Sequence, residues 1–290
     1  MRVLILGAAG LIGHKLFERG SARFDCYGTI NHIKTEFPQA PFLQSERIVE
    51  NIDVRDFSQL EGVIRAIDPQ VILNCVGITK RKDEIRDPVT ALSVNALFPH
   101  KLAGLCRDLD VRLIHFSTDC VFDGAIGNYS EDSLTTGQDT YGRTKAFGEV
   151  TEGPALTIRS SFIGREICGF TELLEWALSQ NGKQIKGFTN AFYSGVSTIK
   201  MTEVVFDIIE NHPSLSGLYQ LATETPISKY DLLCCARDAF SLDIEIEPDS
   251  DFTIMPTLDG GRLRQALDLK LPGWPEMMSE LAADPLYKSN

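Results

Sequence analysis

The chain has 290 residues, of which 43% are hydrophobic and 23% are charged, and its formal net charge at pH 7 is −12. These values are typical of a soluble globular protein, and the length allows one large domain with a smaller one attached. The negative charge argues against a nucleic acid or an anionic membrane as partner, because the long-range field repels polyanions. Any phosphate-bearing ligand would therefore need local hydrogen-bond donors.

The sequence favours a cytoplasmic protein without a metal site. Its apolar runs, such as Val3–Leu6, are far shorter than a membrane span, and the N-terminus runs into a glycine-rich turn with no cleavable signal. The seven cysteines are scattered, and none lies at a spacing typical of zinc ligands. We therefore expect reduced thiols, no metal and no membrane partner.

The chain begins with a pattern typical of dinucleotide binding. The strand-like run Val3–Leu6 leads directly into a turn with three glycines and then into a predicted helix from His14 to Gly20. In this order the free amides of the helix point at the turn, where they can bind a pyrophosphate, and a Cβ at the first two glycines would obstruct its approach. The predicted cofactor contacts of this turn are Gly7, Gly10, Leu11, Ile12 and Gly13.

The end of the next predicted strand, Phe24–Thr29, bears on which cofactor binds. NAD-binding units place a carboxylate there to hold the ribose diol, but this chain has small polar and basic residues, among them Thr29 and Asn31, and no carboxylate before Glu36. Such residues accommodate a 2′-phosphate, so NADPH is favoured over NADH. Residues 35 to 47 are polar and interrupted by proline, which predicts a surface loop.

Three further predicted strands continue the alternation of strand and helix. The strand Ile48–Asp53 ends beside Asp53 and Val54, which we expect near the adenine, although a simple helix cap by Asp56 is the plainer reading of that segment. The other strands are Val71–Gly77 and Val111–Phe116, with helices at Phe57–Ile67 and Val89–Leu109. The sequence therefore predicts an α/β fold with a doubly wound parallel Rossmann sheet.

Polar and small residues end two of these strands at the carboxyl edge of the sheet, where open α/β sheets bind ligands. One strand ends with Asn74, Cys75, Val76 and Gly77, and Ser117 and Thr118 follow the other. The run Lys80–Lys82 follows the first strand, and we read it as a solvated turn rather than as a phosphate contact.

Tyr141 and Lys145 form the chemical group around which the chain is organised. They lie four residues apart on a predicted helix, so both side chains project toward the turn that carries Thr118. A lysine about 4 Å from a phenol supplies roughly the 4 kcal/mol needed to bring its pKa from about 10 toward 7. The pair is therefore sufficient for general acid chemistry, although Tyr-x-x-x-Lys alone also occurs by chance.

With these residues assembled, the chain resembles the extended branch of the short-chain dehydrogenase/reductase superfamily. Ser117–Gly124 is similar to the Ser-Thr-Asp-Tyr-Val-Phe-x-Gly signature of its dTDP-4-dehydrorhamnose reductase group, with Cys120 where an aromatic residue is common. The resemblance implies a catalytic set of Asn95, Thr118, Tyr141 and Lys145. It implies further cofactor contacts at Ser117, Tyr141, Lys145 and Ser161. It implies substrate contacts at Thr118, Asp119, Val121, Tyr141, Asn190 and Arg262.

The second half is expected to hold a smaller, discontinuous α/β part that binds the substrate. We place the dinucleotide-binding domain at residues 1–160, with 196–224 returning to it, and the substrate-binding part at residues 161–195 and 225–290. Predicted strands at Ala155–Arg159 and Gly217–Ala222 and a helix at Ser228–Phe240 underlie this division. Arg262 stands out in the last segment because a guanidinium pairs bidentately with a nucleotide diphosphate.

The first hypothesis for function is an NAD(P)H-dependent reductase of a 4-keto-6-deoxy sugar nucleotide, with Tyr141 as general acid. An epimerase or dehydratase of the same superfamily stays open, because Asp119 supplies the carboxylate that dehydratases need beside the threonine. A cofactor-binding regulatory subunit without turnover is a third reading. The sequence leaves the base, the sugar, the product stereochemistry and a homodimer open.

Overall fold

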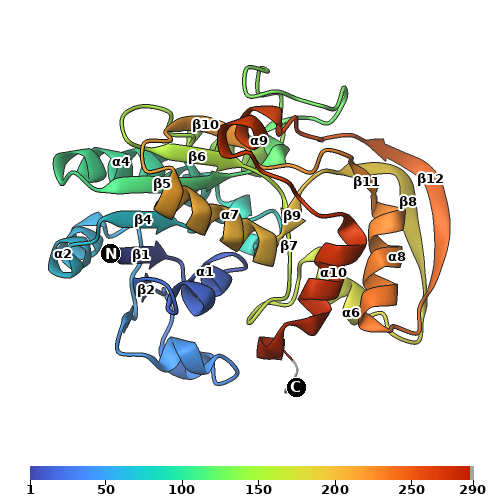
Figure 1. The fold of residues 1–290 in the computed structure, drawn as a ribbon, viewed down its shortest axis with the longest axis horizontal. Helices are drawn as coiled ribbons and strands as arrows, with labels where there is room; N and C mark the ends of the chain where they lie inside the picture. Colours follow the sequence, from blue (N-terminus) through green and yellow to red (C-terminus); the bar gives the residue numbers. More distant parts are fainter. Residues whose placement is uncertain (288–290) are drawn as a thin grey trace.

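The computed structural model describes residues 1–287 and is organised around one sheet of seven parallel strands (Figure 1). The strand order is β10 (Gly217–Gln220), β6 (Leu156–Arg159), β5 (Arg112–Ser117), β4 (Val71–Asn74), β1 (Arg2–Leu6), β2 (Asp25–Thr29) and β3 (Ile48–Val49). This sheet confirms the predicted doubly wound α/β fold.

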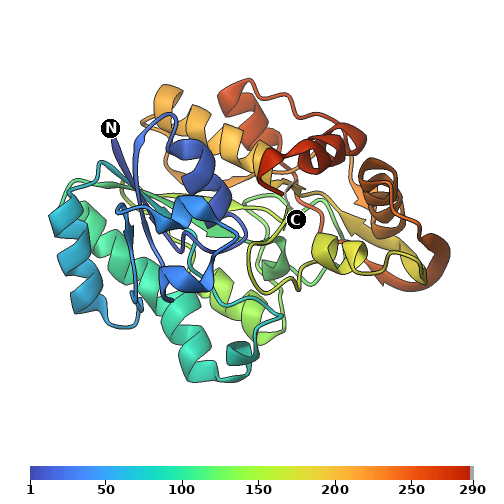
Figure 2. The same cartoon turned by 90° about the horizontal axis from the view of Figure 1, so that it is seen from below.

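Helices cover both faces of the sheet, as alternate side chains of its strands require. In β1, Val3 and Ile5 belong to the core under α1 (Gly13–Gly20) and α7 (Thr198–Asn211), whereas Leu4 and Leu6 belong to the opposite core. That second core lies under α2 (Phe57–Ile67) and α4 (Phe98–Asp108), and Figure 2 shows the two helix layers on either side. The strands are therefore apolar on both faces, which is typical of a central parallel sheet.

The strand register brings the carboxyl ends of the central strands together. Leu6 at the end of β1 pairs with Asn74 on one side and with Thr29 on the other, and Asn74 pairs with His115 of β5. Residues that follow these strands therefore meet at one edge of the sheet.

A second, smaller sheet, built from strands of the second half of the chain, extends from that edge (Figure 1). Its central strand β8 (Gln184–Tyr193) pairs in parallel with β12 (Glu245–Ile254) and antiparallel with β11 (Ile227–Ser228). Helices α6 (Leu173–Leu178) and α8 (Lys229–Phe240) pack beneath it around a small apolar core that includes Ile185 and Leu233. The short strands β7 (Phe162–Ile163) and β9 (Val196–Ser197) pair beside the main sheet.

The predicted helix Val89–Leu109 is interrupted. The structure has a short helix α3 (Pro88–Ala91), then a π-helical segment Leu92–Leu97 and then α4. Pro99 explains the break, because its ring displaces the carbonyl four residues earlier, that of Asn95, and it has no N–H to donate to it. The π-helix therefore leaves the carbonyl of Asn95 available for other contacts.

Two other expectations also need correction. The segment at 35–47 is not simply a surface loop, since it forms two 3₁₀ turns, Lys34–Glu36 and Pro41–Gln44, and buries Phe37 and Leu43 against the core. The third strand ends at Val49 rather than at Asp53. Strand β3 is a short edge strand, and its two residues, Ile48 and Val49, pair with β2.

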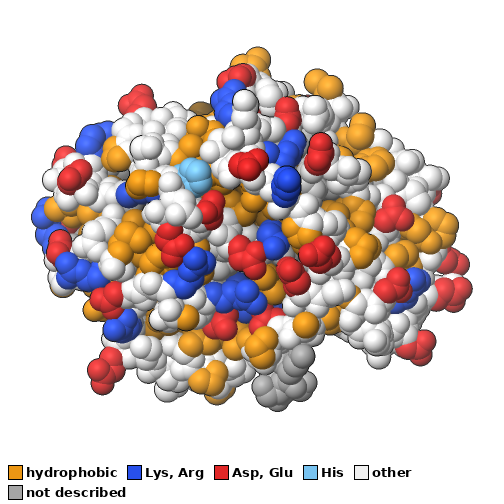
Figure 3. Space-filling view, viewed as in Figure 1, with side chains coloured by type: hydrophobic (Ala, Val, Ile, Leu, Met, Phe, Trp, Pro, Cys, Tyr) orange, Lys and Arg blue, Asp and Glu red, His pale blue; other side chains and the backbone are white. Residues whose placement is uncertain are grey.

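The remaining helices lie along the second half and at the site. They are α5 (Thr140–Phe147), α9 (Gly261–Leu267) and α10 (Trp274–Ala283), with 3₁₀ turns at Asp83–Arg86, Asp119–Val121 and Pro285–Tyr287. Among residues 1–287, no helix is both long enough and apolar enough to cross a bilayer. On the face shown in Figure 3, acidic and basic side chains are interspersed.

Candidate functional site

A cavity of about 520 Å³ opens at the carboxyl edge of the main sheet and reaches the smaller sheet. The glycine turn after β1, the ends of β4 and β5, and helix α5 line one side of it, and strand β8 and the start of α8 line the other. Twelve of the predicted site residues line it: Gly10, Leu11, Ile12, Cys75, Val76, Gly77, Ser117, Thr118, Asp119, Tyr141, Lys145 and Ser161. Residues from segments far apart in the sequence therefore share one cavity.

The other predicted site residues lie outside this lining: Gly7, Gly13, Thr29, Asn31, Asp53, Val54, Asn95, Val121, Asn190 and Arg262. Asn31 is exposed beyond β2, and Asp53 is ion-paired with Arg55 at 2.5 Å, which lowers the pKa of its carboxyl. Asn190 donates to the carbonyl of Ser250 within the smaller sheet. For these polar residues the cofactor and substrate roles stay predictions.

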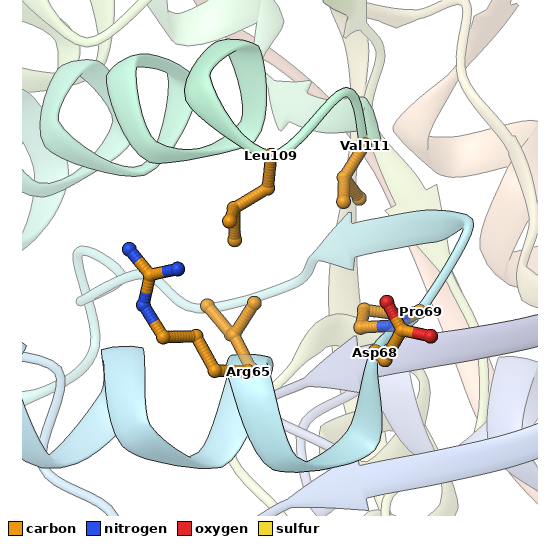
Figure 4. A pocket seen from close by; sticks show the side chains of 6 residues that line it. Arg65, Asp68, Pro69, Leu109 and Val111 are labelled. Carbon is orange, nitrogen blue, oxygen red and sulfur yellow. The ribbon is translucent and has the colours of Figure 1, made fainter.

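A second, smaller hollow of about 190 Å³ lies away from this site (Figure 4). It is formed where α2 and α4 end, between Arg65 and Leu109, just before strands β4 and β5 begin. That is the amino edge of the sheet, opposite the end at which the predicted residues gather.

The glycine turn has the geometry that a dinucleotide pyrophosphate requires. Gly7 adopts φ +80°, a conformation that favours glycine, and the amides of Gly7 and Ala8 donate to the carbonyl of Thr29 at 3.1 and 2.8 Å. A Cβ on Gly13 would come within 2.1 Å of the Gly7 carbonyl oxygen, so only glycine lets α1 start this close to the strand. No side chain caps the first turn of α1, although the amide of His14 already donates to the Gly10 carbonyl at 3.1 Å.

Helix α5 brings Tyr141 and Lys145 into the cavity by close packing. Asp139 caps the helix by accepting from the amide of Gly142 at 2.7 Å, and a Cβ on Gly142 would lie 2.2 Å from the Cys120 carbonyl oxygen. At the other end, a Cβ on Gly148 would lie 1.9 Å from the carbonyl oxygen of Asn95. Both ends of the helix thus rest directly on the backbone of neighbouring site segments.

Asn95 is fully buried and holds segments together rather than lining the cavity. Its side-chain oxygen accepts from the amide of Ile78 at 2.8 Å, and its Nδ2 donates to the Ile78 carbonyl at 3.0 Å and to Thr144 Oγ1 at 3.2 Å. Thr144 precedes Lys145 in α5, so Asn95 ties this helix to the loop after β4. Its predicted catalytic role would act through this positioning.

The protonation states of Tyr141 and Lys145 are set mainly by burial. Burial raises the pKa of the Tyr141 phenol far above its ordinary value, and the nearby Thr118 hydroxyl offsets only part of this. Burial lowers the pKa of the Lys145 ammonium to about 8, while Glu149 opposes that change. The expected lowering of the phenol pKa by lysine is not found, since burial raises that pKa and the Lys145 ammonium donates instead to the Phe116 carbonyl at 2.6 Å.

The sequence reasoning missed Glu149 entirely. Its carboxylate accepts from Ser117 Oγ at 2.7 Å and forms a buried ion pair with Arg159 at 2.7 Å. The Ser117 hydroxyl is thus engaged in a structural hydrogen bond to Glu149. Glu149 lies just after α5 ends at Phe147, so no helical spacing in the sequence links it to Lys145.

Lys80, Arg81 and Lys82 also line the cavity, although the sequence favoured a solvated turn, and Lys229 from α8 joins them. Tyr193 lines the cavity as well, and its buried hydroxyl has no hydrogen-bond partner among residues 1–287. The same part of the chain contains no group of histidine, cysteine, aspartate and glutamate side chains that could hold a metal.

Comparison with known proteins places this site in a family context. The family model described as the RmlD substrate binding domain matches residues 1–253. A dTDP-4-keto-6-deoxy-D-glucose reductase from Streptomyces niveus is 33% identical over 151 residues, which cover 51% of this chain and 46% of that protein. The chain thus aligns with just under half the length of that relative.

Two other relatives align over longer stretches. A probable low-salt glycan biosynthesis reductase from Haloferax volcanii is 25% identical over 80% of this chain and 77% of its own length. The methionine adenosyltransferase 2 subunit beta of Xenopus tropicalis is 26% identical over 83% of this chain and 72% of its own.

Solved structures agree in fold. The dTDP-4-dehydrorhamnose reductase of Bacillus anthracis, in complex with NADP, superimposes with a TM-score of 0.79 at 20% identity and covers 97% of this chain and 96% of its own. The Bordetella bronchiseptica enzyme WbmG, in complex with NAD and UDP, gives a TM-score of 0.78 at 17% identity, with 97% and 94% covered. Since the family model spans most of the chain, the resemblance seen in its motifs is confirmed, and this protein belongs to the RmlD substrate-binding domain family of the extended short-chain dehydrogenases/reductases.

Proposed function

We propose that this protein is an NAD(P)H-dependent reductase that converts the keto group of a 4-keto-6-deoxy sugar nucleotide into an alcohol. The observation that carries the proposal is the single cavity into which Thr118, Tyr141 and Lys145 project beside the glycine turn, in a chain that belongs to this family. Reductase relatives such as that of Streptomyces niveus support the substrate class.

In this proposal the chain supplies the proton and the electrostatics. When bound, a reduced nicotinamide supplies the hydride. Tyr141, which burial keeps protonated, donates its proton to the oxygen of the reacting carbonyl, and Thr118 donates a hydrogen bond to the same oxygen. Lys145 then stabilises the phenolate with its ammonium, and Asn95 keeps α5 in place through Thr144.

The test removes only the phenolic proton. Tyr141→Phe should bind NADPH as the wild type does but lose turnover of a 4-keto-6-deoxy sugar nucleotide by roughly 10²- to 10⁴-fold, which NADPH absorbance would record. Tyr27→Phe, in a strand outside the cavity lining, is the matched control. Near-normal turnover by Tyr141→Phe would end the assignment.

We propose NADPH as the preferred cofactor, because the segment after β2 offers Asn31, His32 and Lys34 rather than a ribose-binding carboxylate at the strand end. Within that segment His32 is already paired with Glu36 at 2.9 Å, so Lys34 is the more available cation for a 2′-phosphate. Titrations of the two reduced cofactors should give the lower dissociation constant for NADPH, and tighter binding of NADH would contradict the preference.

A regulatory subunit is a second candidate, favoured by the long alignment with the methionine adenosyltransferase 2 beta subunit. Purification from cell extract discriminates between the two functions. A stoichiometric enzyme partner, together with no turnover of any keto-sugar nucleotide, would favour this reading over the reductase. The epimerase alternative predicts product formation without net oxidation of NADPH.

A further inference from the structure

The cavity is far more basic than the rest of this acidic chain. Its lining holds five cations and three carboxylates, whereas the chain as a whole carries a net charge of −12. Lys145 serves the proposed proton chemistry, which leaves four cations without a role: Lys80, Arg81, Lys82 and Lys229, together called the basic cluster. Such a local excess of positive charge marks a place for an anion.

The basic cluster is assembled from both parts of the chain. Lys80, Arg81 and Lys82 follow strand β4 of the main sheet, whereas Lys229 is the first residue of α8, directly after strand β11 of the smaller sheet. Burial lowers the pKa of the Lys229 ammonium most, and the nearby charges of Arg81 and Lys80 lower it further. The charge of Asp119, next to Thr118, raises it. The cluster therefore lies next to the reacting end of the cavity.

The members of the cluster differ in their internal partners. Lys80 is paired with Asp139 at 2.7 Å and Arg81 with Glu172 at 3.3 Å. Within residues 1–287, neither Lys82 nor Lys229 has a carboxylate within 4.0 Å.

Lys229 is the more informative of the two, because it is half-buried. Burial lowers the pKa of its ammonium, and the charge of Asp119, which lies beyond ion-pair distance, offsets only part of that cost. An anionic ligand in the cavity would supply the missing partner.

Arg262, expected from the sequence to hold the nucleotide diphosphate, has a different environment. Its side chain is 44% exposed and is paired with Asp132 at 2.5 Å and with Glu131 at 3.5 Å. It does not line the cavity. Its positive charge is already compensated by the exposed carboxylate of Asp132 and the buried one of Glu131.

We propose that the basic cluster, with Lys229 as its principal contact, binds the diphosphate of the sugar nucleotide; this rests on the proposed function. A diphosphate diester is a dianion, which suits the charge excess of the lining. The neighbouring wall supports the same ligand. Ser228, just before Lys229, pairs with Phe192 of β8, and Phe192 and Phe252 both line the cavity with aromatic surface on which a nucleobase can stack.

The experiment measures nucleoside diphosphate binding without turnover. Calorimetric titration with dTDP and with UDP should show Lys229→Gln weakening the dissociation constant by about 10- to 100-fold, as expected for the loss of a partly buried charge-assisted hydrogen bond. Lys229→Arg should recover most of the affinity. Lys101→Gln, on the exposed surface of α4, is the matched control, and NADPH titration of each variant verifies the fold.

Each outcome bears on the proposal. If Arg262→Gln weakens dTDP binding and Lys229→Gln does not, or if neither does, the assignment of the basic cluster is overturned while the reductase function stands. If the wild type binds neither nucleotide and also fails to oxidise NADPH with any keto-sugar nucleotide, both proposals fall. Should Lys229→Gln not fold, Lys82→Gln provides the test, because its ammonium is also without a carboxylate and should weaken dTDP binding.

Discussion

Lys145 should reduce the stability of the protein while serving its function. Its ammonium is buried, donates to the Phe116 carbonyl at 2.6 Å, and has no carboxylate within ion-pair distance among the described residues. Replacing it by methionine, which has a similar length and no charge, should therefore abolish turnover and raise the melting temperature at pH 7.

The magnitude follows from the pKa of the ammonium. A change from 10.5 to about 8 on folding corresponds to about 3 kcal/mol of destabilisation at neutral pH. Losing the hydrogen bond to the Phe116 carbonyl destabilises the variant by about 1 kcal/mol, which offsets part of this gain. The net gain for Lys145→Met is about 2 kcal/mol, or about 5 °C in melting temperature for a chain of this size.

The sign of the predicted stability change for Lys145→Met can be checked by varying the pH. Because the pKa of the amine is lower in the folded state, the unfolded chain binds more protons between pH 8 and 10.5, so the wild type recovers stability as pH rises through that window. Calorimetry at pH 7 and 9.5 should show the advantage of the variant shrinking from about 5 °C to near zero. Lys183→Met, on the exposed surface, should show no such trend. A variant that melts below the wild type at pH 7 would refute the reasoning.

Two further predictions concern the packing around the site. Gly148→Ala should destabilise the protein by about 1–3 kcal/mol, because its Cβ would meet the Asn95 carbonyl. Gly62→Ala has open space around it in α2 and should stabilise the protein by about 1 kcal/mol. Chemical denaturation measures both changes, and equal effects would contradict the packing argument. Glu149→Gln should cost about 3–5 kcal/mol by leaving Arg159 buried without its anion, and a loss below about 1 kcal/mol would show the pair to be dispensable.

The sequence predicted the parts of the site that follow from strand ends. A glycine turn after one parallel strand and a Ser-Thr pair after another must meet at the carboxyl edge, so the order of residues along the chain is enough to bring Gly10 and Thr118 together, whereas Tyr141 lies on α5 and depends on how that helix packs. Neither the register nor the second sheet is needed for that inference. Local order and the rules of parallel sheets are sufficient.

The features that the sequence could not predict depend on contacts between segments far apart. Lys229 lies almost 150 residues beyond Lys80, and only the pairing of β11 with β8 brings it to the same cavity. The pKa of the Tyr141 phenol depends on burial, which a helical spacing does not reveal. Pro99 is visible in the sequence and predicts a break in the helix, but the close approach of Gly148 to the Asn95 carbonyl depends on how α5 packs.

The structure also links stability to ligand binding. Lys145 and Lys229 are cations that burial disfavours, and neither has a carboxylate within ion-pair distance in the part of the chain that is described. A cation in the cavity that is only partly compensated destabilises the empty protein, and the proposed phosphate would supply the missing partner. Binding of a nucleotide would then remove part of the penalty in addition to the ordinary mass-action stabilisation. Under this proposal, the residues that weaken the empty fold are the ones that would attract an anion into a chain whose net charge repels it.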